Sequence, residues 1–192
     1  MIARVVGIQG SGKNLLMTAM AAYFVFNFPE IYSWDKVYTN FTVIYPGAHY
    51  LKNKAMKAFI RKVNATEENG GEIGIKNADG SYKWENIIIL VDEIDGLYPQ
   101  WGHGDKDAQR DLSGAYQDEK LHNQIFCTTH KPDNFNKIMR DAAEVIAVPE
   151  FDESEDILYM EFIDDRFRNI GEIIVEPASV LFDCYDREEV VI

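Results

Sequence analysis

Gly7-Ile8-Gln9-Gly10-Ser11-Gly12-Lys13-Asn14 is the stretch of sequence that decides the fold. It follows a short apolar run over 2–6 and precedes a longer apolar run over 15–26. Glycines allow the backbone of such a loop to turn its N–H groups inward. The first turn of the following helix adds unpaired N–H groups and the positive end of its dipole. The stretch therefore predicts a strand, a phosphate-binding loop (P-loop) and a helix.

The spacing GxxxxGK is complete, and Lys13 supplies the positive charge for the β- and γ-phosphates of ATP. The next residue is Asn14 in place of the usual serine or threonine, and its amide oxygen can bind Mg²⁺ or a magnesium-bound water. A chance glycine-rich turn is the plain alternative. A dinucleotide-binding loop is excluded, because Leu15 stands where its third glycine is required. The predicted nucleotide contacts are Gly7, Gln9, Gly10, Ser11, Gly12, Lys13, Asn14 and Leu15.

A second motif follows the apolar run over 87–91, where Asp92 and Glu93 stand at the end of an expected central strand. This is a Walker B pattern. Asp92 is expected to accept hydrogen bonds from a magnesium-bound water or from Asn14, and Glu93 to polarise the water that attacks the phosphate. Acidic residues at a strand end can also be simple turn formers, but their occurrence together with the P-loop favours ATP hydrolysis. Asn14 and Asp92 are thus the predicted Mg²⁺ ligands.

The composition predicts one globular domain over 1–192 without a disulfide framework. The net charge is −13, so the surface as a whole repels nucleic acid and anionic membranes. A contact with DNA therefore requires a local basic patch or a pore built by several copies. The two cysteines, Cys127 and Cys184, indicate a reducing cytoplasm, and Cys127 is expected as a buried free thiol. The apolar run over 15–28 is too short to span a bilayer.

The periodicity of the chain predicts an α/β fold, a P-loop NTPase with a mainly parallel central sheet, helices on both faces and an antiparallel edge near the C-terminus. An insertion at about 45–85 is expected to carry a helix and a small hairpin. The antiparallel edge is expected from the runs 157–162 and 173–175. The remaining predicted elements are strands over 2–6, 36–41, 87–91, 125–130 and 144–148, and helices over 13–26, 50–63, 106–122 and 135–142.

The expected helix over 50–63 concentrates positive charge, because five of the chain's 19 basic residues fall within 52–62. Lysines and arginines clustered in this way can contact the phosphate backbone of a nucleic acid. They can equally form a solvated helix face. The sequence leaves both interpretations open.

The order of these motifs resembles the additional-strand P-loop ATPases. Within them it is similar to the Zot-like (zonular occludens toxin-like) assembly ATPases of filamentous phages and to the viral packaging ATPases of the FtsK–HerA superfamily. The resemblance spans positions 7–141. It is carried by the P-loop over 7–14, Val37-Tyr38-Thr39-Asn40, Val91-Asp92-Glu93, Asn123-Gln124-Ile125-Phe126-Cys127-Thr128-Thr129-His130 and Met139-Arg140-Asp141.

The resemblance implies a ring of identical subunits that hydrolyses ATP and moves viral DNA, with Lys13, Glu93, His130 and Arg140 as catalytic residues. His130 stands where the family usually has a glutamine that senses the γ-phosphate. Arg140 best matches the arginine that acts at the subunit interface, with Arg110 in reserve. The resemblance further implies a cytoplasmic or virion-associated location and contact with virion or membrane assembly proteins. Phage members carry a transmembrane helix after the ATPase region, and none is expected in this chain.

Two other functions stay open on the sequence. A small nucleotide kinase suits the length, but such kinases hold the transferred phosphate with several lid arginines. Here Arg110, Arg140, Arg166 and Arg168 do not cluster along the chain. A nucleotide-binding assembly factor without turnover is supported only by Asn14 at the magnesium position.

Overall fold

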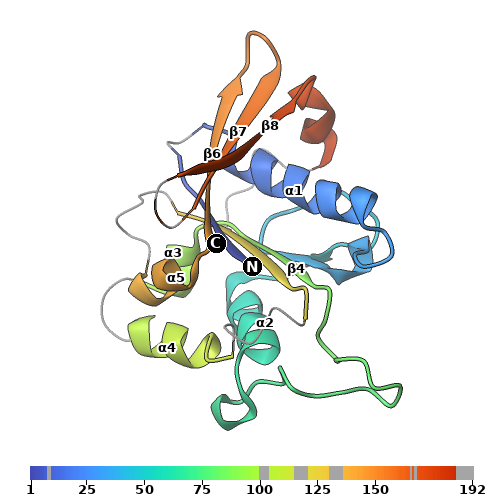
Figure 1. The fold of residues 1–192 in the computed structure, drawn as a ribbon, viewed down its shortest axis with the longest axis vertical. Coiled ribbons are helices and arrows are strands. Elements are labelled where there is room, and N and C mark those ends of the chain that lie inside the picture. The colour runs from blue at the N-terminus through green and yellow to red at the C-terminus, as the bar shows by residue number, and fades with distance from the viewer. Residues whose placement is uncertain are drawn as a thin grey trace.

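The computed structural model describes residues 1–7, 10–99, 104–114, 121–129, 136–164, 166 and 168–184, without the side chains of 104–105 and 182–184. Within these ranges eight strands form one sheet, in the order β3-β2-β4-β5-β1-β6-β7-β8 (Figure 1). The strands are β1 (Ile2–Val5), β2 (Val37–Thr39), β3 (His49–Tyr50), β4 (Ile88–Val91), β5 (Gln124–Thr128), β6 (Val145–Asp152), β7 (Ile157–Asp164) and β8 (Asn169–Val175).

The sheet is parallel from β3 to β6 and antiparallel from β6 to β8. This confirms the predicted mainly parallel sheet with an antiparallel edge near the C-terminus. β6 extends to Asp152, beyond the predicted end at 148, because it pairs with β7 along its whole length. The hairpin pairing supplies backbone partners that the run over 144–148 alone does not reveal.

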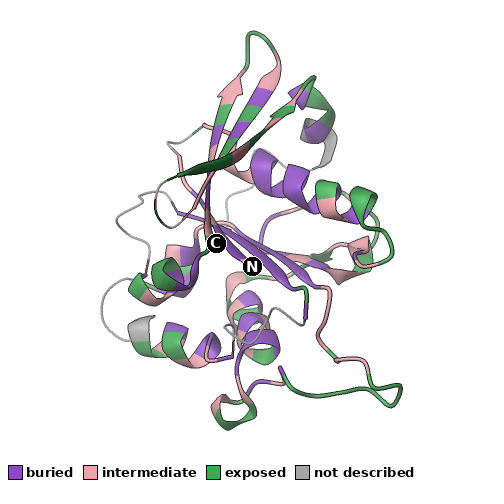
Figure 2. Ribbon diagram, in the orientation of Figure 1, coloured by how far each residue is buried: buried purple, intermediate pink, exposed green. Residues whose placement is uncertain are grey.

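Helices cover both faces of the sheet, and the deepest burial lies along the central strands and the first half of α1 (Figures 1 and 2). Side chains of β1 alternate, so that Ala3 and Val5 join the core beneath one helical layer and Ile2 joins the core beneath the other. No helix in the described part of the chain has the length and apolar character needed to cross a membrane. The first layer holds α1 (Lys13–Asn27) and the 3₁₀ helix η5 (Ala178–Cys184). The second layer holds α2 (Asn53–Asn64), α3 (Ile94–Leu97), α4 (Gly104–Asp111) and α5 (Lys137–Ala142). The 3₁₀ helices η1 (Trp34–Lys36) and η2 (Glu67–Asn69) lie in the connections.

β5 lies between β1 and β4, the strands that lead into the P-loop and into Asp92-Glu93. Val5 of β1 pairs with Thr128 of β5, and Cys127 of β5 pairs with Val91 of β4. Because the three strands are parallel, their C-terminal ends meet at one edge of the sheet. β5 therefore lies beside both strands that lead into the predicted motifs.

The insertion over 45–85 contains the expected helix, with a shifted start. α2 begins at Asn53 instead of 50, because His49–Tyr50 pairs with β2 as a short parallel strand. The expected hairpin is reduced to a single bridge between Lys76 and Tyr82. The glycine-rich sequence around it supplies turns but little side-chain packing, which a longer hairpin requires.

The predicted helix over 106–122 does not continue unbroken, because it is interrupted after Asp111. α4 ends at Asp111, and 112–114 form a turn. The Gly114 N–H donates to the carbonyl of Asn64 at the end of α2 (2.8 Å), so the chain leaves the helical path to meet another element. Residues 115–120 lie outside the described part of the chain.

Cys127 is buried in β5, as expected for a free thiol of the core. Burial raises the pKa of the Cys127 thiol to about 12, against a smaller opposing effect of Arg4 on the neighbouring strand. The thiol therefore stays protonated at neutral pH and is a packing group, not a nucleophile.

Much of the positive charge of α2 is neutralised within the chain. Lys57 Nζ forms an ion pair with Asp107 of α4 (2.7 Å), and Arg61 Nε lies 3.1 Å from the Asp111 carboxylate. Asp111 is buried and also accepts a hydrogen bond from Arg110 Nε (2.7 Å). The basic residues of α2 thus hold α4 in place as well as facing solvent.

Asp111→Ala is expected to lower the free energy of unfolding by about 3 kcal/mol, because it removes the acceptor of the buried Tyr98 hydroxyl and of Arg110 Nε, and the ion-pair partner of Arg61. Asp107→Ala is the matched control on the same helix. It removes only partly exposed ion pairs, and we expect it to cost less than about 1 kcal/mol. Urea denaturation of the two variants measures the difference, and equal losses would contradict an anchoring role for Asp111.

Candidate functional site

The P-loop enters α1 through two glycines with positive φ. Gly10 has φ +81° and Gly12 has φ +84°, in the left-handed region that residues with a Cβ rarely adopt. A Cβ on Gly12 would also lie 3.1 Å from Leu158 Cδ1 of β7. The Gly12 carbonyl accepts the Leu16 N–H (2.8 Å), so this glycine opens the helix. The local sequence therefore brings the N-terminus of α1 to the C-terminal edge of the sheet.

Other predicted nucleotide contacts surround this turn. Gly7 packs so closely that a Cβ on it would lie 2.3 Å from Ser11 Oγ, which is itself buried. The Leu15 side chain is buried in the core beneath α1, so only its backbone N–H faces toward a ligand at the helix start. Gln9 lies outside the described residues.

Lys13, the first residue of α1, extends its side chain back over the loop. Its Nζ donates a hydrogen bond to the Gly7 carbonyl (3.1 Å). Burial lowers the pKa of the Lys13 ammonium, while the nearby charges of Asp92 and Glu93 act in the opposite direction. A partly desolvated ammonium that faces two carboxylates is well placed to gain from a bound polyphosphate.

Asn14 and Asp92 are joined across the sheet edge. Asn14 Nδ2 donates a hydrogen bond to Asp92 Oδ2 (3.0 Å), as the sequence predicts for the residue at this P-loop position. The donor side of the amide is thereby turned to Asp92, and the amide oxygen is left as an acceptor. One amide oxygen and one carboxylate form the oxygen ligand set that Mg²⁺ uses when substrate phosphates and waters complete its shell. The described residues contain no cluster of three or more metal-binding side chains.

The Asp92–Glu93 pair lies in a tight turn between β4 and α3. Glu93 has φ 54°, a left-handed conformation that is uncommon for a residue other than glycine. The Thr128 hydroxyl donates to Asp92 Oδ1 and accepts the Glu93 N–H (3.0 Å). The end of β5 therefore fixes both the Asp92 carboxylate and the backbone of Glu93.

The remaining catalytic candidates have different surroundings. His130 lies outside the described residues, and Thr129 before it is buried at the end of β5. Arg140 lies in the last turn of α5 with an exposed side chain, its Nε 3.8 Å from Asp141 Oδ1. Among the described residues, no hydrogen bond or ion pair joins Arg140 to the P-loop. Arg110 is paired with acidic residues of its own helix.

Sequence reasoning assigned no role to Thr128 or to Asn40, although both touch the Asp92–Glu93 turn. Asn40 follows β2 and Thr128 ends β5, and both strands pair with β4. Polar residues at the C-terminal ends of adjacent parallel strands are the sequence signal that could have identified them. The pairing of these strands had to be known before that signal could be used.

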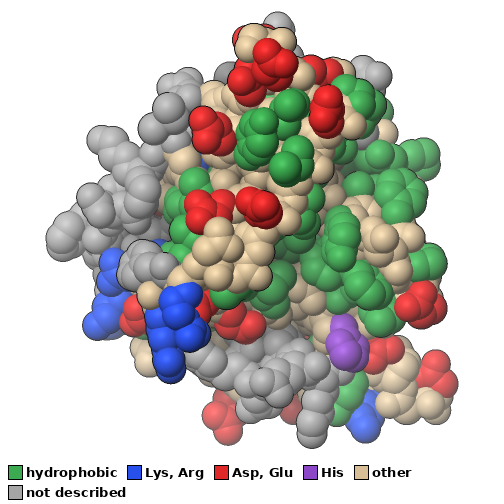
Figure 3. All heavy atoms as spheres, turned by 45° about the horizontal axis from the view of Figure 1, so that its top comes forward, with side chains coloured by type: hydrophobic (Ala, Val, Ile, Leu, Met, Phe, Trp, Pro, Cys, Tyr) green, Lys and Arg blue, Asp and Glu red, His purple; other side chains and the backbone are tan. Residues whose placement is uncertain are grey.

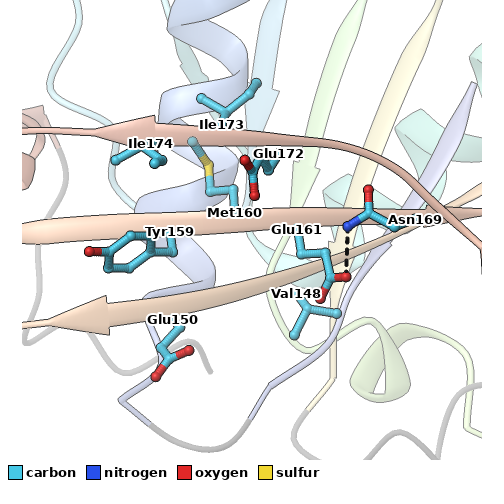
Figure 4. A pocket seen from close by; sticks show the side chains of 9 residues that line it. All are labelled: Val148, Glu150, Tyr159, Met160, Glu161, Asn169, Glu172, Ile173 and Ile174. Carbon is cyan, nitrogen blue, oxygen red and sulfur yellow. Dashed lines mark hydrogen bonds between the residues drawn. The ribbon is translucent and has the colours of Figure 1, made fainter.

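A hollow of about 270 Å³ lies on the antiparallel part of the sheet and is lined by none of the predicted site residues (Figure 4). Glu150, Glu161 and Glu172 line it, beside Tyr159. Figure 3 shows that further acidic side chains gather around the tip of the β6–β7 hairpin. These carboxylates repel a triphosphate, so the hollow is not a second nucleotide site.

Residues 4–150 match the model of the ATPase family associated with various cellular activities (AAA). The chain belongs to this family. It is a P-loop ATPase that binds ATP, as the two motifs predict, and both motifs fall within the matched residues. A search of the curated proteins finds no match.

Several solved structures share the fold. The N-terminal domain of zonular occludens toxin from Neisseria meningitidis has a TM-score of 0.58 and 20% identity, with 96% of this chain and 98% of that chain covered. The genome packaging NTPase B204 from Sulfolobus turreted icosahedral virus 2, in complex with ATP-gammaS, has a TM-score of 0.52 and 10% identity, with 92% of this chain and 97% of that chain covered. At these identities the likeness establishes the fold, which confirms the fold implied by the resemblance to Zot-like and viral packaging ATPases.

Proposed function

We propose that this ATPase is a motor of viral assembly that hydrolyses ATP to translocate or package DNA. The observation that carries the proposal is the hydrogen bond from Asn14 to Asp92 (3.0 Å), which joins the P-loop helix to the acidic end of β4 in one site. The viral setting is supported by the resemblance of the motifs to Zot-like and viral packaging ATPases and by one protein of the same fold that is described as a viral genome packaging NTPase.

In this proposal the P-loop side of the site binds the triphosphate. Lys13 and the N–H groups at the start of α1 contact the β- and γ-phosphates. Asn14 and Asp92 hold Mg²⁺ through the amide oxygen and the carboxylate, an assignment that fits their hydrogen bond. When bound, Mg²⁺ would neutralise the negative charge that develops on the phosphates.

The acidic side of the site activates water. Glu93 accepts the proton of the attacking water, from a turn that Thr128 holds. His130 donates a hydrogen bond to the γ-phosphate. Arg140 stabilises the transition-state charge in a neighbouring subunit's site, a role that suits its exposure on α5 and requires a ring of subunits. We place this ring in the host cytoplasm, where it contacts virion or membrane assembly proteins.

DNA contact in this proposal falls to the N-terminal end of α2. The chain as a whole has a net charge of −13, so binding depends on a local patch. Lys57 and Arg61 are paired with α4, whereas Lys52 and Lys54 are exposed. Lys54 at the start of α2 and Lys52 just before it thus support a contact with phosphate groups.

Phosphate release by the full chain, measured with duplex DNA, with single-stranded DNA and without DNA, tests this function. We expect DNA to raise the turnover about twofold or more at low salt, and the stimulation to fall as salt rises, because phosphate contacts release counterions. Lys52→Ala with Lys54→Ala is expected to lose more of the stimulation than the control pair Lys76→Ala with Lys137→Ala, two exposed lysines outside α2.

Turnover that no DNA changes at any salt concentration would contradict the DNA motor. Transfer of the γ-phosphate to a nucleoside monophosphate, in place of its release, would identify a kinase. The mass of the protein in solution with ATP, Mg²⁺ and DNA reports whether a ring forms, and a monomer under all of these conditions would remove the proposed role of Arg140.

A further inference from the structure

Asn40 binds the backbone of the Walker B turn with both ends of its side-chain amide. Its Oδ1 accepts the Asp92 N–H (2.7 Å), and its Nδ2 donates to the Asp92 carbonyl (2.8 Å). Asn40 directly follows β2, the strand that pairs with β4, and it is fully buried. The side chain thus continues the strand pairing for one residue after the ladder of β2 with β4 has ended.

Asn53, the first residue of α2, fixes the orientation of this amide. Asn40 Nδ2 donates its second hydrogen to Asn53 Oδ1 (2.9 Å). The oxygen and both amide hydrogens of Asn40 are therefore used, and a flipped amide would lose all three hydrogen bonds. The start of α2 is in this way tied to the Walker B turn through one side chain.

The turn needs such support because its backbone is unfavourable. Glu93 follows Asp92 with φ 54°, and a residue with a side chain adopts this conformation at a cost in free energy. Thr128 holds the turn on the β5 side, through the Asp92 carboxylate and the Glu93 N–H. Asn40 holds it on the β2 side, through the two peptide groups of Asp92. The peptide that leads into Glu93 is thereby fixed from both neighbouring strands.

We infer that Asn40 is a positioning residue for hydrolysis, which sets the direction of the Glu93 side chain toward the attacking water, with Asn53 holding the Asn40 amide in the required orientation. The inference rests on the role of Glu93 given under the proposed function. Asn40 touches no reacting atom in this scheme, so its loss acts on turnover more than on nucleotide binding.

Asn40→Ala is expected to lower kcat for ATP by about 10- to 100-fold, the size of effect that a small misplacement of a catalytic group produces, with KM within about threefold. Asn123→Ala is the matched control. Asn123 is also buried, and it makes the same two-ended contact at the other end of β4, where Oδ1 accepts the Ile87 N–H (3.0 Å) and Nδ2 donates to the Trp84 carbonyl (3.0 Å). We expect this variant to lose thermal stability like Asn40→Ala but to keep kcat at temperatures where it is folded.

The Asn53 variants provide a test that does not depend on the folding of Asn40→Ala. Asn53→Ala removes only the acceptor for Asn40 Nδ2, and we expect kcat to fall about threefold or more. Asn53→Asp keeps an acceptor oxygen and adds a negative charge that is favourable at a helix start, so we expect kcat to return to near the wild-type value.

These outcomes separate the inference from the proposed function. Loss of kcat in Asn40→Ala and Asn53→Ala, with retention in Asn123→Ala and Asn53→Asp, supports the positioning role. Wild-type kcat in folded Asn40→Ala, or equal loss in Asn40→Ala and Asn123→Ala, overturns it. Glu93→Gln, assayed beside them, overturns the proposed function instead if it keeps the wild-type rate.

Discussion

Glu93→Gln is expected to reduce the rate of ATP hydrolysis by about 100-fold or more, the contribution that a general base typically makes. Glutamine has nearly the same shape but cannot accept the proton of the attacking water. The turn that holds position 93 depends on its backbone N–H and on Thr128, which the substitution leaves in place. Nucleotide binding should therefore be retained, so that kcat falls and the dissociation constant for ATP changes little.

Phosphate release and ATP binding, measured on the same preparation, check this expectation. Glu150→Gln is the control, because it makes the same chemical change in the hollow of Figure 4, on a strand that carries neither motif. It should hydrolyse ATP like the wild type. A wild-type protein that binds ATP tightly and releases no phosphate would instead support the assembly factor without turnover.

Lys13→Ala is expected to weaken ATP binding by about 100-fold or more. The Lys13 ammonium faces a site with two carboxylates, and its charge-assisted hydrogen bonds to phosphate are worth about 1.5–3 kcal/mol each, with every 1.4 kcal/mol equal to a factor of ten. The substitution also removes a positive charge that offsets the repulsion between the triphosphate and the carboxylates of Asp92 and Glu93. Titration calorimetry with ATP and Mg²⁺ measures the effect, and Lys54→Ala, an exposed lysine of α2, is the control.

The same variant has an expected signature without nucleotide. Burial lowers the pKa of Lys13 below its ordinary value of 10.5. Between the lowered pKa and 10.5, the unfolded chain binds more protons at Lys13 than the folded chain does. The contribution of Lys13 to the free energy of unfolding therefore increases as the pH rises through this range. Lys13→Ala should lack this contribution and lose none of its thermal stability at neutral pH in the absence of nucleotide. A large destabilisation of the nucleotide-free protein would show that Lys13 is mainly a structural residue.

The two motifs could be predicted because their signals are local. The glycine spacing over 7–14 and the apolar run over 87–91 with its terminal acids require no knowledge of the rest of the chain. The hydrogen bond between Asn14 and Asp92 was one of two interactions predicted for Asp92, the other being with a magnesium-bound water. The position of β5 between β1 and β4 was not predicted, because no local pattern sets the order of strands in the sheet.

What the sequence could not reveal depends on contacts between distant segments. Asn40 and Asp92 are far apart in the chain, and nothing near Asn40 indicates that its amide binds a turn beside β4. The early end of α4 has the same origin, because Gly114 turns aside to meet Asn64. The prediction of a helix beyond Asp111 rested on helical propensity alone, and a tertiary contact ends the helix there.

The crystal structure of the Glu93→Gln variant with ATP and Mg²⁺ tests the central claim most directly, since that variant should bind nucleotide without consuming it. We predict the triphosphate over the first turn of α1, with Lys13 on its β- and γ-phosphates, Mg²⁺ bound by Asn14 and Asp92, and position 93 facing the γ-phosphate. A nucleotide bound elsewhere, or a bound triphosphate that Lys13 and Asp92 do not approach, would contradict the account.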